Sequence, residues 1–324
     1  MQALILAGGR GMRMRPLSDI YPKPLLYLPG GTLLDYLLAH LRHLPLDEVA
    51  IILHPEEDRM ERHLARGEAR RGVSGHLVPG VDGVGPRETS GLKLIPQQPP
   101  FTLLGALASA ADWVRGLTLV VHADSYFSTP LHYFLHPFVK GQSRTPTFLV
   151  GADGPPGSRS LGRAQAGAYV LPPEAFQIAG SIADADSLLA LSAELAVRGI
   201  ERVDVPVRGW HCNVDEPTDL LALNRHLLTH WHEAAVLLGA HIGYDPMSFS
   251  WIAPSADVDV QRMGLYVTVG ENAVVRDSHL HNCLVFPGVS LAGAEEENTI
   301  LVEDQNSCLH IYAGHGRSQP AAFF

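Results

Sequence analysis

Cysteine and lysine are both scarce in this chain of 324 residues. The three cysteines form no CxxC pair, so the sequence predicts neither a disulfide framework nor a structural zinc site. Lysine also occurs only three times, at Lys23, Lys93 and Lys140, against 21 arginines. Because a chain so poor in lysine still places one between two prolines, we expect Lys23 to have a functional role.

Long apolar runs and a basic leader are absent as well. No apolar run reaches about 18 residues, so we expect no membrane span. The N-terminus carries no basic segment ahead of an apolar run of roughly 7–15 residues, so we expect no secretory signal. A net charge of −10 argues against a nucleic-acid partner. These absences predict a cytoplasmic protein without membrane or nucleic-acid partners, and the length allows two domains.

Strand-like and helix-like segments alternate through the first two-thirds of the chain. The expected strands are 2–7, 48–54, 117–124, 146–152, 167–172 and 202–207, and the expected helices are 33–44, 56–71, 103–115, 187–199 and 217–234. Such interleaving is typical of an α/β fold with a doubly wound, mostly parallel sheet. Ligands of such sheets bind at the carboxyl ends of the strands. The Gly- and Pro-rich segments 73–102 and 153–165 are expected to be loops.

The pattern changes after about residue 240. Six-residue units appear there, each with an aliphatic residue at its first place: Ile252, Val258, Val269, Val275, Val285 and Leu291. Ile252 lies 17 residues before Val269, and Val269 lies 16 before Val285, close to a coil of about 18 residues. This spacing resembles the hexapeptide repeat of left-handed β-helices, with unrelated short strands as the alternative. We therefore predict domains at 1–238 and 239–324.

A glycine-rich bend follows the first strand. Gly8, Gly9 and Gly11 allow the backbone to fold tightly and to expose several N–H groups together. Such a nest binds phosphate, and the cations of Arg13 and Lys23 would neutralise it. The bend lacks the Lys-Ser or Lys-Thr of a P-loop and the third glycine of a dinucleotide fingerprint. A plain structural turn is the alternative interpretation.

Residues 6–26 resemble the signature LAGGxGTRLxPLTxxxPKPL of the sugar-1-phosphate nucleotidyltransferases. The matching positions are Leu6, Ala7, Gly8, Gly9, Gly11, Arg13, Pro16, Leu17, Pro22, Lys23, Pro24 and Leu25. The resemblance implies a Rossmann-like nucleotidyltransferase fold that binds a nucleoside triphosphate, a sugar 1-phosphate and Mg²⁺. Members of this family often carry a left-handed β-helix tail, so the two resemblances support each other.

The resemblance also assigns roles in the reaction. The sugar phosphate attacks the α-phosphorus and releases pyrophosphate. Because this nucleophile is already an anion, the reaction needs charge neutralisation and positioning rather than a base. By resemblance, Arg13 contacts the triphosphate, Lys23 steadies the α-phosphoryl or sugar phosphate, and the backbone of residues 6–11 binds the nucleotide. For Arg15, a surface ion pair is the favoured interpretation.

Asp124 is the expected first metal ligand. It closes a predicted strand in the sequence HADSYF, where the family has a pattern like LGDxLF with its metal-binding aspartate. The family's second ligand follows a tryptophan in WxDxGTPED, and here Asn213 stands near that position, one residue displaced. Asp215 is a rival ligand. For both residues, a place at the start of the helix from Pro217 is the alternative.

The base and sugar sides of the family site depart from the pattern. The family's base loop, QxPxGTAGAL, is represented by Gln98 and by GAL from Gly105, but Thr102 replaces its glycine. On the sugar side, Gly167 and Tyr169 match the family's aGiYv, whereas the EKP segment is missing. Arg159 or Arg163 could supply the charge that EKP would carry.

The sequence leaves three functions open. The first is a nucleotidyltransferase acting on a hexose 1-phosphate, with mannose-1-phosphate guanylyltransferase as the first choice. The second is a catalytically silent homologue that binds nucleotide sugars, and the third is an acyltransferase served by the β-helix. His226, His230 and His232 indicate a solvated or interface cluster rather than a zinc site. Since short β-helices usually pack against another subunit, we expect a homo-oligomer.

Overall fold

The structure is a computed structural model that divides the chain into two compact units. The first comprises Met1–Arg10, Leu37–Asp153 and Leu161–His211, and the second comprises Gly11–Tyr36, Gly154–Ser160 and Cys212–Phe324. The described residues are 1–9, 11–70, 92–139, 145–151, 165–206, 209–239, 242–259, 263–304, 307–312 and 319–320. The predicted division at residue 238 stays a prediction, and the units are described in turn.

A seven-stranded sheet forms the centre of the first unit. Its order is β10 (Val203–Pro206), β8 (Thr147–Val150), β9 (Gln165–Leu171), β6 (Thr118–His122), β1 (Gln2–Leu6), β4 (Glu48–Leu53) and β5 (Lys93–Pro96). Only β9 runs antiparallel to its neighbours β6 and β8, and the other pairs in this sheet are parallel. The predicted α/β fold with a mostly parallel sheet is confirmed. A further strand of this unit is β7 (Ser125–Phe127).

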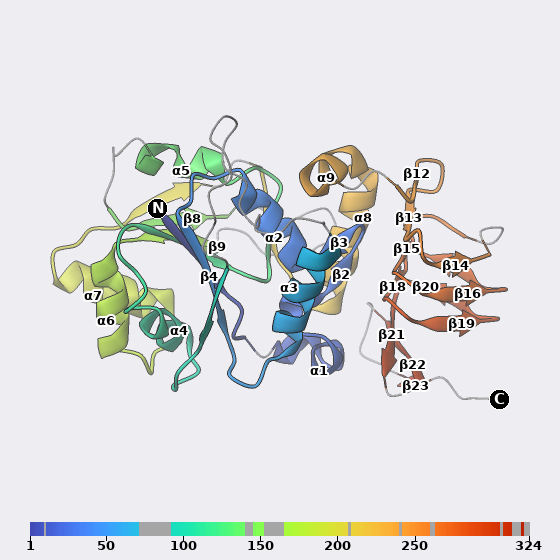
Figure 1. Cartoon of the computed structure of the whole chain (residues 1–324), viewed down its shortest axis with the longest axis horizontal. Coiled ribbons are helices and arrows are strands. Elements are labelled where there is room, and N and C mark those ends of the chain that lie inside the picture. The colour runs from blue at the N-terminus through green and yellow to red at the C-terminus, as the bar shows by residue number, and fades with distance from the viewer. Residues whose placement is uncertain are drawn as a thin grey trace. The chain divides into compact units, whose positions relative to one another are not determined.

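Helices pack on this sheet through apolar side chains. The helices of the unit are α3 (Arg59–Arg70), α4 (Leu103–Ser109), α5 (His132–Val139), α6 (Pro173–Ser181) and α7 (Leu188–Val197), and α2 runs from Leu33 to Arg42. Figure 1 shows α4, α6 and α7 together along one side of the sheet. Leu107, Phe176 and Leu191 from these helices are fully buried in one core with the strands. Burial of each such side chain stabilises the fold by about 1.5–3 kcal/mol.

The second unit combines the segment after the glycine bend with the C-terminal third of the chain. The segment holds η1 (Met12–Met14), α1 (Leu17–Ile20), η2 (Lys23–Leu25), β2 (Tyr27–Leu28) and β3 (Gly31–Thr32). Strand β11 (His211–Asn213) leads into α8 (Pro217–Thr229) and α9 (Trp231–Leu238). The single helix predicted for 217–234 is therefore wrong, because the chain breaks at His230, which ends α8 and begins α9.

Parallel ladders run through the C-terminal strands. One joins β13 (Ser250–Ile252), β15 (Thr268–Val269), β18 (Leu284–Val285) and β21 (Thr299–Asp304), a second joins β14 (Asp257–Val258), β16 (Val274–Arg276) and β19 (Ser290–Ala292), and a third joins β17 (His279–His281) to β20 (Glu295–Glu297). Ile252 pairs with Val269 and Val269 with Val285, as the repeat predicts. Antiparallel β12 (Tyr244–Asp245), β22 (Ser307–Tyr312) and β23 (Gln319–Pro320) complete these sheets.

Left-handed backbone recurs at one corner of each successive coil. Phe249, Tyr266, Asn282 and Asn298 have φ between 48° and 60°, and they follow one another at the same spacing as the paired strands. The rings of Phe249 and Tyr266 stack with centroids 5.6 Å apart, and Asn282 Nδ2 donates to Asn298 Oδ1 at 2.7 Å. These features are consistent with a β-helix with coils slightly shorter than 18 residues, and its left hand stays a prediction.

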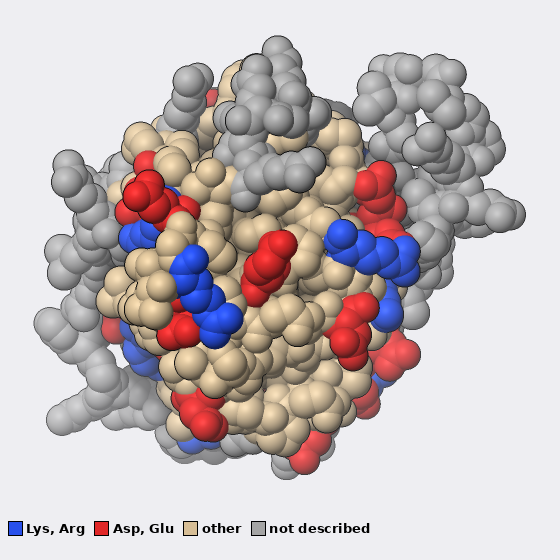
Figure 2. Space-filling model, turned by 90° about the vertical axis from the view of Figure 1, so that its left-hand side faces the viewer, with Lys and Arg blue, Asp and Glu red and all other residues tan. Residues whose placement is uncertain are grey.

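Two further observations concern the membrane and nucleic-acid expectations. Within the described ranges, no helix combines the length and the apolar character needed to span a membrane. On the face of the first unit that Figure 2 presents, acidic and basic side chains are interspersed, and the described residues of that face form no continuous basic patch. This face therefore offers no broad electrostatic footprint for nucleic acid.

Candidate functional site

In the first unit, the glycine bend follows β1 and Asp124 follows β6, so both lie at the carboxyl ends of two adjacent strands. Leu6, at the end of β1, pairs in register with His122 at the end of β6. The Leu6 carbonyl accepts a hydrogen bond of 3.0 Å from the Ala123 N–H. Asp124 follows directly and is partly buried. Carboxyl ends of adjacent parallel strands are where ligands of this fold class bind, so the predicted phosphate bend and the predicted metal ligand share that edge.

Gly8 must be a glycine because a glutamine side chain lies against it. A Cβ at Gly8 would lie 2.3 Å from Gln97 Oε1. The buried Gln97 is held in place, since its Nε2 donates to the Thr102 carbonyl at 2.8 Å and its N–H to the Leu53 carbonyl at 2.8 Å. The partly buried side chain of His54 packs its ring on the exposed Phe101, with centroids 4.6 Å apart. The role of the neighbouring Gln98 in nucleotide binding stays a prediction.

The base-loop positions have structural partners of their own. Thr102 caps α4, since its Oγ1 accepts a hydrogen bond of 2.9 Å from the Gly105 N–H. A Cβ at Gly105 would lie 2.0 Å from the Pro100 carbonyl oxygen, so the loop passes directly over this glycine. Gln98 is exposed, and its N–H donates to Ser109 Oγ at 2.9 Å. A threonine in the place of the family's glycine therefore serves as a helix cap.

The predicted sugar-side residues pack against the end of β6. Gly167 has φ +66°, and a Cβ there would lie 2.1 Å from Ser125 Oγ. Tyr169 is completely buried, which raises the pKa of its phenol, and its hydroxyl lies 3.1 Å from His122 Nε2. The buried hydroxyl of Tyr169 therefore lies within hydrogen-bond distance of His122, which is partly exposed, and the role of Tyr169 in sugar binding stays a prediction. Sequence reasoning did not select His122, although it stands two residues before Asp124 in HADSYF.

In the second unit, both predicted catalytic cations meet one carboxylate. Lys23 Nζ donates to Asp215 Oδ1 at 2.9 Å, and Arg13 Nη2 lies 3.0 Å from Asp215 Oδ2. Gly11 has φ +60°, and a Cβ there would lie 3.1 Å from Lys23 Cγ, so the lysine stem rests on the glycine. The Lys23 side chain is 10% exposed, whereas that of Arg13 is 67% exposed. The arrangement brings two cations beside the last glycine of the bend.

Asp215 is positioned by the start of α8. Glu216 is the N-cap of this helix, and Asp219 Oδ2 accepts hydrogen bonds from the N–H groups of Asp215 at 3.0 Å and Glu216 at 2.9 Å. Asn213 ends β11 two residues earlier and is partly exposed. Asp215 therefore lies at the start of the helix from Pro217, as the alternative interpretation of this residue stated. The role of Asn213 as a metal ligand stays a prediction.

Two smaller expectations can be compared with the structure. Arg15 Nε lies 3.0 Å from Asp19 Oδ1, and both side chains are more than half exposed, so Arg15 forms the surface ion pair that we favoured. His226 and His230 stack with ring centroids 4.2 Å apart, and burial together with the His230 charge lowers the pKa of His226 to about 4. Across the described residues, no group of three or more His, Cys, Asp or Glu side chains could hold a metal.

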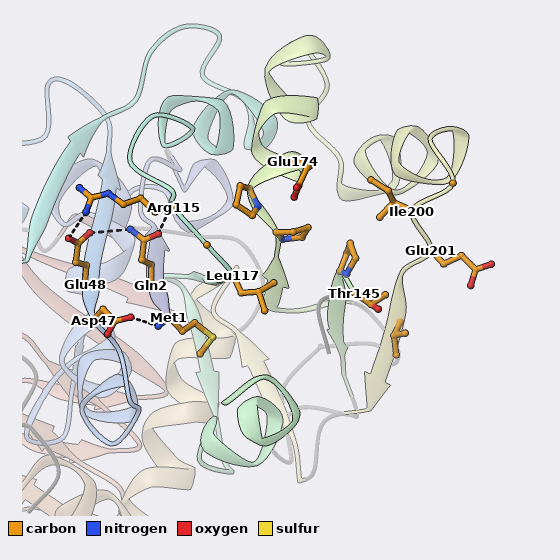
Figure 3. Close-up of a pocket in the computed structure, with 16 residues that line it drawn as sticks. Met1, Gln2, Asp47, Glu48, Arg115, Leu117, Thr145, Glu174, Ile200 and Glu201 are labelled. Atoms are coloured by element: carbon orange, nitrogen blue, oxygen red, sulfur yellow. Dashed lines mark hydrogen bonds and ion pairs between the residues drawn. The ribbon is translucent and has the colours of Figure 1, made fainter. Parts of the chain in front are cut away.

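A hollow of about 1270 Å³ opens at the other edge of the first unit's sheet (Figure 3). Its walls include Gln2, Glu48 and Val203, which stand at the amino ends of β1, β4 and β10. Gln2 Nε2 donates to Glu48 Oε2 at 3.1 Å, and the Met1 amino group pairs with Asp47. The hollow therefore lies away from the carboxyl ends of the strands, where the motif residues of this unit gather.

Some sequence expectations fall outside the described residues. These are Arg159, Arg163, most of the predicted loops at 73–102 and 153–165, and the end of the chain from residue 313 apart from 319–320.

Part of this sequence is similar to the sequences of known proteins. Residues 2–162 match a family model described as nucleotidyl transferase. N-acetylmuramate alpha-1-phosphate uridylyltransferases from Caulobacter vibrioides and Neisseria meningitidis are 34% and 32% identical over 31% and 42% of this chain. The N-terminal half of the chain is thus similar to nucleotidyl transferases, among them uridylyltransferases of a sugar 1-phosphate. These matches cover 43% and 60% of the two relatives, so the chain spans about half of their length.

A solved structure has a similar fold at low sequence identity. The structure, from Bacillus anthracis, is described as a glucose-1-phosphate thymidylyltransferase in complex with a sucrose. It superposes with a TM-score of 0.53 and 16% identity, over 75% of this chain and 97% of that one. The likeness confirms the fold class expected from the sequence.

Proposed function

We propose that this protein transfers a nucleotidyl group from a nucleoside triphosphate to a sugar 1-phosphate and releases pyrophosphate. The observation that carries the proposal is the meeting of Lys23 and Arg13 at one carboxylate beside Gly11. Two fixed cations next to a glycine bend suit an anionic substrate with several phosphate groups. The match of residues 2–162 to the nucleotidyl transferase model supports the same reaction class.

In the proposed reaction, an oxygen of the sugar phosphate attacks the α-phosphorus. A new P–O bond forms as the bond between the α-phosphorus and the bridging oxygen breaks, and pyrophosphate leaves. Lys23 and Arg13 would neutralise charge on the reacting phosphates, which is worth roughly 10²–10³ in rate for one such donor. Since an ammonium has three N–H donors and a guanidinium has five, both cations can donate to phosphate oxygens while they contact Asp215.

We propose that Asp124, which follows the carboxyl end of β6, holds a magnesium ion. Mg²⁺ takes one or two carboxylates together with phosphate oxygens and water, so Asp124 alone is chemically sufficient on the protein side. When bound, the ion would neutralise charge on the triphosphate. Asp124 would hold it, and the role of Asn213 as a ligand stays a prediction made from the sequence. A site made of protein ligands alone is not needed.

For the substrates, we propose UTP and a hexose 1-phosphate. Both relatives reported above are named as uridylyltransferases of a sugar 1-phosphate, which supports uracil as the base. The first choice made from the sequence, GTP with mannose 1-phosphate, has no support in these names and stays a prediction. Because Thr102 caps a helix where the family has glycine, the base loop differs from the pattern that would identify the base.

A silent nucleotide-sugar-binding homologue remains the second candidate. The observation that favours it is the pairing of both cations with Asp215, which reduces the positive charge offered to a phosphate. A protein that binds without turnover would retain affinity for a nucleotide sugar and release no pyrophosphate.

The test is pyrophosphate release from five nucleoside triphosphates, each paired with several sugar 1-phosphates in the presence of magnesium. We expect turnover with UTP, and a loss of at least roughly 10²-fold in Lys23→Met and Asp124→Asn. Lys93→Met is the matched control, because Lys93 is exposed on β5, and it should retain full activity. Absence of pyrophosphate with every pair, together with tight nucleotide-sugar binding, would support the silent homologue instead.

A further inference from the structure

An exposed aromatic ring stands on the loop between β5 and α4. Phe101 is 47% exposed, although the residues on both sides of it are anchored. The carbonyl oxygen of Pro100 lies 2.0 Å from the place of a Cβ at Gly105, and Thr102 Oγ1 accepts the N–H of the same glycine at 2.9 Å. The backbone at Phe101 is therefore held by its neighbours, while much of the side chain stays in solvent.

The ring of Phe101 rests on the imidazole of His54. The two centroids are 4.6 Å apart and the planes are inclined by 39°. His54 follows the carboxyl end of β4, and its side chain is 16% exposed, so it supports the phenyl ring from the protein side. Contacts between aromatic rings at such distances are favourable and limit how the rings turn. Phe101 is therefore an exposed ring that is already oriented.

This ring lies beside the glycine bend. A Cβ at Gly8 would lie 3.9 Å from the backbone nitrogen of His54 and 2.3 Å from Gln97 Oε1. Gln97 Nε2 in turn donates at 2.8 Å to the carbonyl of Thr102, the residue after Phe101. Strands β1, β4 and β5 are adjacent and parallel, so the bend, His54 and Gln97 all follow carboxyl ends. A ligand held by the N–H groups of the bend would have this aromatic ring near it.

We propose that Phe101, supported by His54, is the surface on which the base of the nucleoside triphosphate stacks. Phosphate groups suit the N–H groups of the bend, and a flat base suits an exposed aromatic ring, so a nucleotide matches both features. Because every base has a π-face, stacking adds affinity and leaves the choice among bases to other groups. The inference rests on the proposed function for the identity of the ligand, but it concerns binding and requires no turnover.

The alternative is that Phe101 only covers His54 and the loop. Both interpretations keep the contact between the two rings, but only the proposal makes Phe101 contribute to the affinity for ligands that contain a base. Inorganic tripolyphosphate separates the two interpretations, because it offers three phosphate groups and no base.

The experiment measures the dissociation constants of UTP and of tripolyphosphate for the full-length chain by calorimetry with magnesium. We expect Phe101→Ala to weaken UTP binding at least about fivefold and to leave tripolyphosphate binding unchanged. Phe101→Trp should retain UTP binding, because it keeps an aromatic face. Tyr133→Ala is the matched control: Tyr133 is 53% exposed on α5, and its ring also packs on a histidine, His132, with centroids 4.1 Å apart. It should leave both constants unchanged.

His54 is a positioning residue in this proposal. His54→Ala should weaken UTP binding in the wild-type background and have no further effect in Phe101→Ala, because it acts through the phenyl ring. Additive losses in the double variant would contradict that role.

An unchanged affinity of Phe101→Ala for UTP, an equal loss with tripolyphosphate, or a wild-type protein that binds no nucleotide overturns the stacking proposal. If Phe101→Ala does not fold, nuclear Overhauser effects in the wild-type complex decide: the base protons H5 and H6 should show contacts to phenylalanine ring protons that are missing in Phe101→Trp. Their absence in the wild-type complex overturns the proposal.

The two proposals fail in different ways. A protein that binds UTP through Phe101 and releases no pyrophosphate would refute the transfer reaction and leave stacking intact. Full turnover in Phe101→Ala with an unchanged KM for UTP would support the reaction and refute stacking.

Discussion

Lys23 Nζ lies 2.9 Å from Asp215 Oδ1, and the same carboxylate reaches Arg13 with its second oxygen at 3.0 Å. The Lys23 side chain is almost buried, at 10% exposed. A buried ammonium is stable only when an opposite charge and hydrogen bonds replace its hydration. Asp215 therefore holds the Lys23 side chain in its place in the fold and also balances the positive charge of its ammonium.

We predict that Asp215→Asn lowers the free energy of unfolding by about 1–3 kcal/mol, because it leaves a nearly buried ammonium without its counter-charge. The substitution preserves side-chain size and the partner's position. Equilibrium unfolding in urea at neutral pH measures the change.

Asp19→Asn is the control for that measurement. Asp19 forms an ion pair with Arg15 in the same unit, but both side chains are more than half exposed. Its loss should therefore cost no more than about 0.5 kcal/mol. Equal effects of the two substitutions would show that Asp215 does not stabilise Lys23.

Gly8 provides a second prediction, since its missing side chain leaves room for Gln97. In Gly8→Ala, the new methyl would lie 2.3 Å from Gln97 Oε1, so the glutamine or the bend must move. Under the proposed function, we expect pyrophosphate release to fall by at least about tenfold, because a shifted bend misplaces its N–H groups. Steady-state kinetics with the best substrate pair measures the loss.

Gly9→Ala is the matched control, because a Cβ at Gly9 would meet no atom within 4 Å. We expect it to retain most of the activity. Adding Gln97→Ala to Gly8→Ala should restore part of the rate by removing the clash. A Gly9→Ala protein as impaired as Gly8→Ala would show that the contact with Gln97 is not the cause.

The register of the C-terminal coils was predictable from sequence, and several site contacts were not. The aliphatic residues repeat because each must fill the same interior position, so Val269 pairs with Val285 as expected. By contrast, Lys23 and Asp215 are 192 residues apart, and no local pattern links them. The sequence also does not show that Gln97 is buried while the adjacent Gln98 is exposed. The resemblance to a known motif therefore locates a segment of the chain, whereas the side-chain contacts within it depend on how the whole chain packs.

Helix boundaries show the same limit. The continuous apolar pattern of 217–234 predicts one helix, whereas tertiary packing ends α8 at Thr229 and starts α9 at Trp231. The buried Trp231 stacks on Tyr244 with ring centroids 5.5 Å apart, a contact that periodicity alone cannot reveal. Helix α6 is not predicted from the sequence: the predicted strand 167–172 ends at Pro172, which is the N-cap of this helix.

A third prediction concerns acid stability. Burial lowers the pKa of His40 to about 4, and its side chain packs edge-on against Tyr126. Between pH 6.5 and 4, the unfolded chain binds a proton at His40 that the folded chain does not, so this residue makes stability fall as the pH falls. Over this whole pH range, the free energy of unfolding falls by on the order of 3 kcal/mol because of His40. His40→Leu should flatten that part of the stability curve.

Urea unfolding at several pH values from 7 to 4 measures this slope for wild type and variant. His136→Gln, at an exposed position of α5, is the control and should leave the slope unchanged. Parallel curves for wild type and His40→Leu would contradict the assignment of the acid sensitivity to His40.

The last prediction tests the corners of the C-terminal coils. Asn282 has φ +49°, and its Nδ2 donates to Asn298 Oδ1 at 2.7 Å. A β-branched side chain is strained in that conformation, at a cost of about 1–3 kcal/mol, and it also loses the hydrogen bond. We expect Asn282→Val to lower the midpoint of thermal unfolding clearly more than Asn282→Gly, because glycine adopts the left-handed conformation freely and gives up only the hydrogen bond. Equal midpoints for the two variants would mean that backbone strain at this corner is not what selects asparagine.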